Sequence, residues 1–162
     1  MVALTKVQDG GLNLTSAGMP SGTILQVVEN TFSTQVTTSS TSFVTLGSIQ
    51  ASITPSSTSS KILIMFSTSI YTNSTSHSCY ITLYRGTVAS GTNLGETTEG
   101  LGRSWTNAGQ IVSNLNFQLV DEPSTTSAQT YQLGFKADNS STVKYFVFNG
   151  TPSQLTLMEI AG

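Results

Sequence analysis

The stretch Lys61–Tyr71, KILIMFSTSIY, decides the fold predicted for this chain. Its first half, Ile62–Phe66, is apolar on both faces, whereas a strand with one solvated face alternates apolar and polar residues. The run is too short for a convincing helix, and its β-branched and aromatic residues favour a strand. We therefore interpret it as the central strand of a β-sandwich. One face would pack on the second sheet and the other on a further layer, such as a neighbouring subunit.

The composition indicates one globular domain with an unusually neutral surface. Of the 162 residues only 9% are charged, against about 25% in ordinary globular proteins, and Ser and Thr fill the gap. The net charge is −2 and the Lys and Arg residues number six, so no basic stripe can neutralise nucleic-acid phosphates. No apolar run is long enough to cross a membrane, and the single cysteine, Cys79, excludes an intrachain disulfide. We expect neither nucleic acid nor membrane as a partner.

Short strand-like segments separated by turn signals run through the rest of the chain. About nine or ten short strands are expected, and the spacing of the turns between them is typical of an all-β protein. Ser78–Arg85 alternates small aliphatic with aromatic residues and is expected to form an antiparallel hairpin with the central strand. Asn149-Gly150 is a further hairpin signal. The fold class predicted is a two-sheet antiparallel β-sandwich, jelly-roll-like, with an extended N-terminal arm. The other expected strands are Thr23–Glu29, Phe32–Thr38, Ser42–Ile53, Gln110–Val120, Gln129–Ala137, Val143–Phe148 and Gln154–Ile160.

The first part of the chain differs from the body. Residues 1–22 are punctuated by glycines, and Leu12 and Leu14 alternate with polar residues. The segment is too short to build its own core. We expect residues 1–22 to form an arm or neck for attachment or trimerisation, with residues 23–162 as the sandwich domain. A frayed terminus is the alternative.

A binding site is predicted in Gly86–Gly109, the longest stretch without a clear strand pattern. Loops of this length in compact domains are usually functional or mobile. The stretch holds Trp105 beside Arg103 and Asn107. Aromatic rings stack on sugar rings, and planar polar side chains bind hydroxyl groups. These three residues are our candidates for contact with a host-surface carbohydrate. The alternative is that Trp105 only anchors the loop.

The sequence contains few groups of residues that could form a catalytic or metal-binding site. His77 and Cys79 share one face of a strand, but a metal site or a Cys–His nucleophile needs further partners. We expect Cys79 to be a small buried residue and His77 a turn residue. Glu96 and Glu99 are the carboxylate pair to test for glycosidase chemistry, and Asp121-Glu122 has the pattern of a solvated strand end. We expect no catalytic residues, no cofactor and no metal.

Several segments carry a resemblance to a known group of proteins. The most specific is ITPSSTSSKILI followed by a terminal LTLMEI, and Ala89–Thr130 is poorly matched. With these segments the chain resembles bacteriophage tail-fibre and virion surface proteins, especially those of cyanophages and other marine phages. The resemblance implies a structural virion protein, often trimeric, without shared catalytic residues. The segments that carry it are Met1–Val7, Ser21–Val28, Thr34–Ser42, Ser52–Met65, Leu83–Gly86 and Leu155–Gly162.

The function expected is that of a short tail fibre or fibre-tip domain that forms a homotrimer and contacts the host surface. Residues of the N-terminal arm would bind other virion proteins. The start of the sequence, MVALTKVQDGG, has no apolar core of a signal peptide, which suits a virion protein made in the host cytoplasm. The alternative is a capsid decoration or cement protein. A carbohydrate-active enzyme or a lectin-like module is less favoured.

Overall fold

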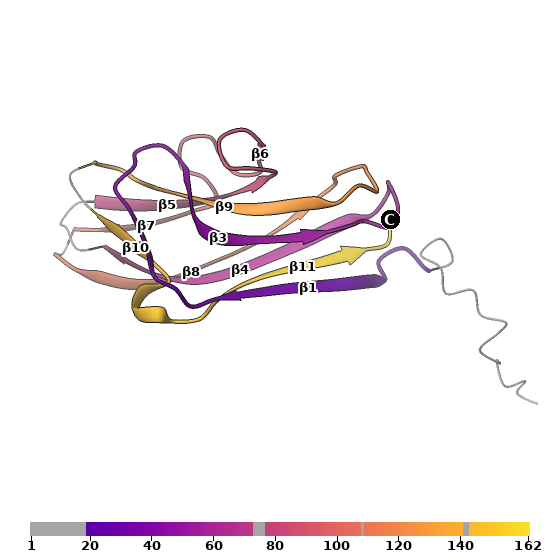
Figure 1. Ribbon diagram of the computed structural model, residues 1–162, viewed down its shortest axis with the longest axis horizontal. Helices are drawn as coiled ribbons and strands as arrows, with labels where there is room; N and C mark the ends of the chain where they lie inside the picture. Colours follow the sequence, from indigo (N-terminus) through magenta and orange to yellow (C-terminus); the bar gives the residue numbers. More distant parts are fainter. Residues whose placement is uncertain (1–18, 73–76, 108, 141–142) are drawn as a thin grey trace, which may run out of the picture.

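Two β-sheets face each other across one core (Figure 1). The computed structural model describes residues 19–72, 77–107, 109–140 and 143–162, except the side chains of residues 46–48. One sheet, which we call sheet A, has the order β1-β11-β4-β10-β2, and β8 pairs with the other side of β4. Its strands are β1 (Ile24–Phe32), β2 (Val36–Thr38), β4 (Lys61–Thr72), β8 (Ile111–Asp121), β10 (Lys144–Phe146) and β11 (Ser153–Ile160).

The second sheet, sheet B, has the order β3-β9-β5-β6, with β7 also paired to β5. Its strands are β3 (Val44–Ile53), β5 (His77–Arg85), β6 (Thr92–Asn93), β7 (Gly102–Thr106) and β9 (Gln129–Ala137). All strand pairs in both sheets are antiparallel. The predicted two-sheet antiparallel β-sandwich is therefore confirmed.

The central position of Lys61–Tyr71 is also confirmed. As β4 it pairs along almost its whole length with β8, and on its other side with β11 and then β10. Ile62 and Ile64 are fully buried and Phe66 nearly so, whereas Leu63 and Met65, which alternate with them, are only partly buried. The strand thus has one core face and one apolar outer face that the described chain leaves partly open.

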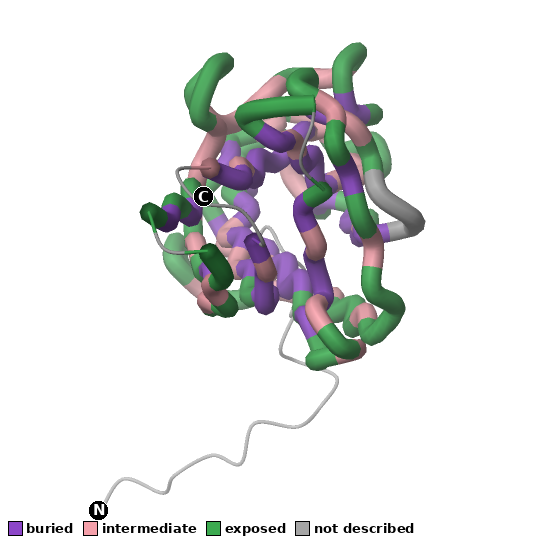
Figure 2. The backbone as a smooth tube through the Cα atoms, turned by 90° about the vertical axis from the view of Figure 1, so that its left-hand side faces the viewer, coloured by how far each residue is buried: buried purple, intermediate pink, exposed green. Residues whose placement is uncertain are grey.

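The core lies between the two sheets. Figure 2 shows buried residues along the inner stretches of the strands and exposed residues mostly in the connections around them. Alternation on each strand directs one row of side chains inward, as the pleat requires. Sheet B contributes fully buried side chains from β5 and β9, and β11 contributes two leucines opposite them. These residues are Ile81, Leu83, Tyr131, Leu133, Phe135, Leu155 and Leu157.

The predicted hairpin between the central strand and Ser78–Arg85 is wrong. β5 pairs with β9, β7 and β6 in sheet B, whereas β4 lies in sheet A. The physical reason is that both strands carry an apolar inner row. Facing β4 across the core buries the row of β5, in which Cys79 is fully buried as expected. Pairing in one sheet would leave both rows to be covered by other strands.

The stretch Gly86–Gly109 is not the open loop that the sequence suggests. It contains β6, β7 and an isolated bridge between Glu96 and Gly100. Gly100 has φ +75°, and a Cβ atom there would lie 2.4 Å from the Ile81 carbonyl oxygen. Only glycine permits this approach to β5. The glycines that disguise the strand pattern are thus what let the segment pack on sheet B.

The hairpin expected at Asn149-Gly150 is wrong as well. β10 pairs with Ile70–Thr72 of β4 and β11 with Lys61–Ser67, so the two strands lie end to end along the same partner. A short 3-10 turn, η2 (Phe148–Gly150), joins them, with Asn149 at φ 54°. Asparagine tolerates this left-handed conformation, which explains why the dipeptide imitates a hairpin turn.

A buried carboxylate joins the Ser/Thr loop Thr54–Ser60 to β11. Glu159 is fully buried, and its Oε1 accepts bonds from the Ser56 N–H, the Ser56 hydroxyl and the Ser60 hydroxyl at 2.6–2.7 Å. Its Oε2 accepts a bond from Gln26 Nε2 at 2.6 Å. Burial alone would raise the pKa of Glu159, but these hydrogen bonds outweigh it and lower that pKa. The ITPSSTSS and LTLMEI segments are therefore in contact in the folded chain, through the hydrogen bonds to Glu159.

The described chain begins at the end of sheet A where β11 stops. Gly22 N–H donates to the Ala161 carbonyl oxygen at 2.8 Å, and Thr23 N–H donates to that of Pro20. Residues 1–18 of the predicted arm lie outside the described residues, so the arm stays a prediction.

Candidate functional site

The outer face of sheet B carries a line of alternating cations and aromatic rings, which we call the cation–aromatic row: Phe43, Lys136, Tyr80 and Arg103. Tyr80 on β5 lies opposite Lys136 on β9 and Arg103 on β7. Lys136 Nζ lies 4.9 Å from the ring centroids of both Phe43 and Tyr80. The Arg103 guanidinium carbon lies 5.7 Å from the Tyr80 centroid. A cation–π contact contributes about 0.5–1 kcal/mol at an exposed site and more where it is shielded from water.

Trp105 extends this row toward the end of β7. It lies two residues after Arg103 and therefore on the same face of the strand, with half of its surface exposed. Arg103 donates to the Ser78 hydroxyl at 3.1 Å and pairs with Glu99 at 3.2 Å. Asn107 follows the end of β7 and is exposed. The structure thus brings Arg103 and Trp105 together on one face, and a role of the three residues in receptor contact stays a prediction.

Sequence reasoning missed the other half of the row. Phe43 and Lys136 are distant in sequence from Tyr80, and no local motif joins them. The available signal was the aromatic face of Ser78–Arg85, which requires neighbours on the adjoining strands. The pairing partner of β5 could not be read from sequence, so neither could the identity of these neighbours.

The outer face of sheet A carries a different feature, which we call the apolar row: Val27, Met158, Leu63 and Val120. These residues lie directly opposite one another across β1, β11, β4 and β8. Val27 and Val120, at the two ends, are 50% and 52% exposed, and the two between them are partly buried. Scattered apolar residues are normal on protein surfaces, but a continuous line across four strands is typical of an interaction surface.

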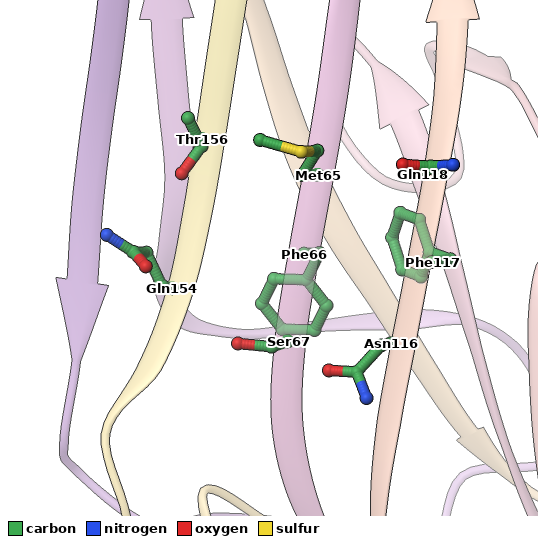
Figure 3. Close-up of a pocket in the computed structure, with 8 residues that line it drawn as sticks. All are labelled: Met65, Phe66, Ser67, Asn116, Phe117, Gln118, Gln154 and Thr156. Carbon is green, nitrogen blue, oxygen red and sulfur yellow. The ribbon is translucent and has the colours of Figure 1, made fainter.

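A shallow hollow of about 440 Å³ lies beside the apolar row on the same face. Met65 on β4 lies between Thr156 of β11 and Gln118 of β8, and further polar side chains from these three strands line the rest of the hollow (Figure 3). Hollow and row together present an apolar strip with hydrogen-bonding groups along one side. The residues that line the hollow are Met65, Phe66, Ser67, Asn116, Phe117, Gln118, Gln154 and Thr156.

Asp121 is not the solvated strand end that the sequence suggests. It is 8% exposed, and Arg85 Nη1 donates to both of its carboxylate oxygens at 3.0 and 2.9 Å. The Tyr131 hydroxyl donates to Oδ2 at 2.7 Å. Burial, followed by the bond to this carboxylate, raises the pKa of Tyr131. Because Asp121 belongs to sheet A and its partners to sheet B, the group ties the two sheets together.

A second charged cluster lies at the start of β5, next to His77 and Cys79, the two residues whose spacing in the sequence could suit a metal or nucleophile site. His77 begins β5 instead of forming a turn, and its Nδ1 lies 3.2 Å from Asp138 Oδ2, which also accepts the Ser78 N–H at 2.6 Å. Lys144 is fully buried, and its Nζ lies 3.8 Å from Asp138 Oδ1. Burial lowers the pKa of Lys144 and raises that of Cys79. A thiol kept protonated in this way is a poor nucleophile.

The carboxylates of Glu96 and Glu99 are engaged locally. Glu96 accepts the backbone N–H groups of Thr98 and Glu99, and these bonds lower its pKa. Glu99 pairs with Arg103. Among the described residues no group of three or more His, Cys, Asp or Glu is placed to hold a metal ion. No helix in this part of the chain is long and apolar enough to span a membrane.

No protein-family profile and no curated protein matches the sequence. Solved structures similar to the chain include that of the Gx strain of infectious bursal disease virus, with a TM-score of 0.46, 13% identity and 88% of this chain covered. The VP2 subviral particle of the same virus gives a TM-score of 0.45, 17% identity and 85% coverage. The match spans only 39% and 38% of those two chains. These likenesses are too distant to bear on function.

Proposed function

We propose that this protein is a structural component of a virus particle that assembles as a homotrimer, most simply as a short tail fibre or fibre-tip domain of a bacteriophage. The apolar row of sheet A is the observation that carries the proposal. The row needs a partner surface, and closed symmetric oligomers provide one for every copy. The sequence resemblance described above adds the phage context.

The edges and charges of sheet A suit such an assembly. β8 pairs only with β4 among the described strands, and its one charged residue, Asp121, is engaged in the core. Exposed strand edges are usually protected by charges or by proline, and an uncharged edge favours association. With 9% charged residues, the surface also responds little to ionic strength. Burial of the apolar row in a defined assembly would prevent nonspecific association through this face.

The cation–aromatic row and Trp105 are the proposed contact with the host surface. An exposed indole ring beside Arg103 and Asn107 offers stacking and hydrogen bonding to a carbohydrate. The test is Trp105→Ala in a glycan-array and host-cell binding assay, with Val112→Ala, a similarly exposed residue on the other sheet, as control. We expect Trp105→Ala alone to abolish binding while both variants keep the native mass. Equal binding by Trp105→Ala and the parent would refute the receptor role.

The second candidate function is a capsid decoration or cement protein. The broad outer face of sheet A favours it, because a row across four strands also fits a flat shell. Labelled antibody on intact particles, viewed by electron microscopy, separates the two candidates. Label at the tail supports the fibre, label over the head supports the decoration protein, and absence of label from purified particles refutes both. That the chain is no enzyme and binds no cofactor, metal or nucleic acid stays a prediction.

A further inference from the structure

We propose that residues 1–18 of a neighbouring copy dock on the outer face of sheet A, across the apolar row and the hollow beside it. The inference rests on the proposed assembly and adds which segment makes the contact and where it lies. Four apolar side chains from four strands form a floor, and the polar groups around Met65 line one side. An extended segment that presents apolar side chains on one face covers such a strip.

The sequence of residues 1–18 matches such a surface. It opens with Met1–Leu4 and later has Leu12 and Leu14, two positions apart, so both leucines share one face when the segment is extended. Asn13 and Thr15 then present polar groups on the other face. The net charge of the segment is zero, because Lys6 and Asp9 are its only charged side chains. A largely apolar segment whose side-chain charges cancel is thus matched to an apolar floor without charged side chains.

The reach of the segment is sufficient. Eighteen extended residues span up to about 60 Å, whereas the apolar row crosses three inter-strand gaps, about 14 Å in all. The described chain that follows the segment also lies near the row. Gly22 pairs with Ala161 at the end of β11, and Val27 and Met158 of the row lie a few residues further into the sheet.

The direction of the chain points to a neighbour. In Figure 1 the described chain before β1 leads past the end of sheet A, beside the C-terminus and away from the sandwich. This direction of the described chain favours an adjacent copy over its own sheet as the docking surface. In a ring of copies each outer face would receive one segment and each copy would donate one, which is a heterologous, closed arrangement.

Disulfide trapping in the full-length chain tests the contact. The variant carries Leu14→Cys and Val120→Cys, and the matched control carries Leu14→Cys and Val112→Cys. Val112 lies on the same strand and the same face as Val120 and is 56% exposed against 52%, but it sits at the other end of β8. The native Cys79 is fully buried and does not interfere. After oxidation we expect covalent multimers at a yield about tenfold higher with Val120→Cys than with the control.

Any result other than this excess of covalent multimers overturns the inference. Equal yields from the two pairs mean that the segment has no preferred place on the face. A disulfide only within one chain means that the segment folds back on its own sheet. A second variant, Leu12→Ser with Leu14→Ser, should lose the trimer in sedimentation. If that variant stays trimeric, the docking inference fails while the homotrimer stands. If the parent protein is itself a monomer, the proposed assembly fails first.

Discussion

The Glu159 site yields the sharpest stability prediction. Glu159→Gln keeps the size of the side chain but removes the charge and one acceptor oxygen. In the parent, one oxygen accepts three hydrogen bonds from Ser56 and Ser60, and the other accepts one from Gln26. Hydrogen bonds to a charged group contribute about 1.5–3 kcal/mol each and neutral ones about 1 kcal/mol. The variant places an amide N–H against the Gln26 donor and weakens the three remaining bonds, so we expect a loss of at least about 3 kcal/mol.

The assay is equilibrium unfolding in urea, followed by circular dichroism, with a thermal scan as support. A loss of about 3 kcal/mol in a chain of this size lowers Tm by roughly 6–12 °C. Glu29→Gln is the matched control, because Glu29 is exposed on the neighbouring strand β1, and it should change stability by less than about 0.5 kcal/mol. Ser60→Ala, which removes a single bond, should cost about 1–2 kcal/mol.

The pH dependence follows from the lowered pKa of Glu159. A carboxyl group with a lower pKa in the folded state binds fewer protons there than in the unfolded chain. Its contribution is complete above the ordinary pKa of 4.5 and is lost as the pH falls toward the folded value. The difference between parent and Glu159→Gln should therefore shrink below about pH 4.5. A variant as stable as the parent at pH 7, or a difference that grows in acid, would refute this role of the carboxylate.

Three other substitutions give distinct results in the same unfolding assay. Asp121→Asn leaves the Arg85 guanidinium half-buried without a counter-charge, and we expect a loss of about 3–5 kcal/mol; a loss below 1 kcal/mol would contradict the tie between the sheets. Lys144→Met removes a fully buried ammonium group that has no hydrogen-bond partner among the described residues, while Asp138 keeps its contacts with His77 and the Ser78 N–H, so the variant should be neutral or stabilising by about 1–2 kcal/mol. Strong destabilisation would show that the amine is needed for folding. Trp105→Ala should cost less than about 1.5 kcal/mol, because half of the ring is exposed, and a larger loss would assign Trp105 to packing.

Local patterns predicted the strands well where alternation was clear. Gln129–Ala137 matches β9, and the run at Lys61–Tyr71 matches β4 within one residue. The register irregularity between Thr45 and Gln50 in β3 spans the glycine at position 47, and a glycine inside a strand favours a bulge. β7 was missed, because glycines and single polar residues hide its pattern and its stability comes from pairing with β5. Tertiary pairing of this kind leaves no local signal.

Long-range pairing also decided the parts of the candidate site that the sequence could not supply. Arg103 and Trp105 were expected near each other, since they are close in sequence. Lys136 joins them only through the pairing of β9 with β5. Asp121 looks solvated in sequence, because its partners Arg85 and Tyr131 come from another sheet. In each case the alternation indicated which face a residue occupies, but not which residue lies opposite.

Sedimentation of the purified full-length protein at micromolar concentration tests the central claim most directly. The claim is that the apolar outer face of sheet A is buried between copies of this chain. The account predicts a single species with three times the 17.1 kDa mass of one chain, and a shift toward monomer when Val120→Lys places a charge in the apolar row. A parent protein that sediments as a monomer would contradict the account.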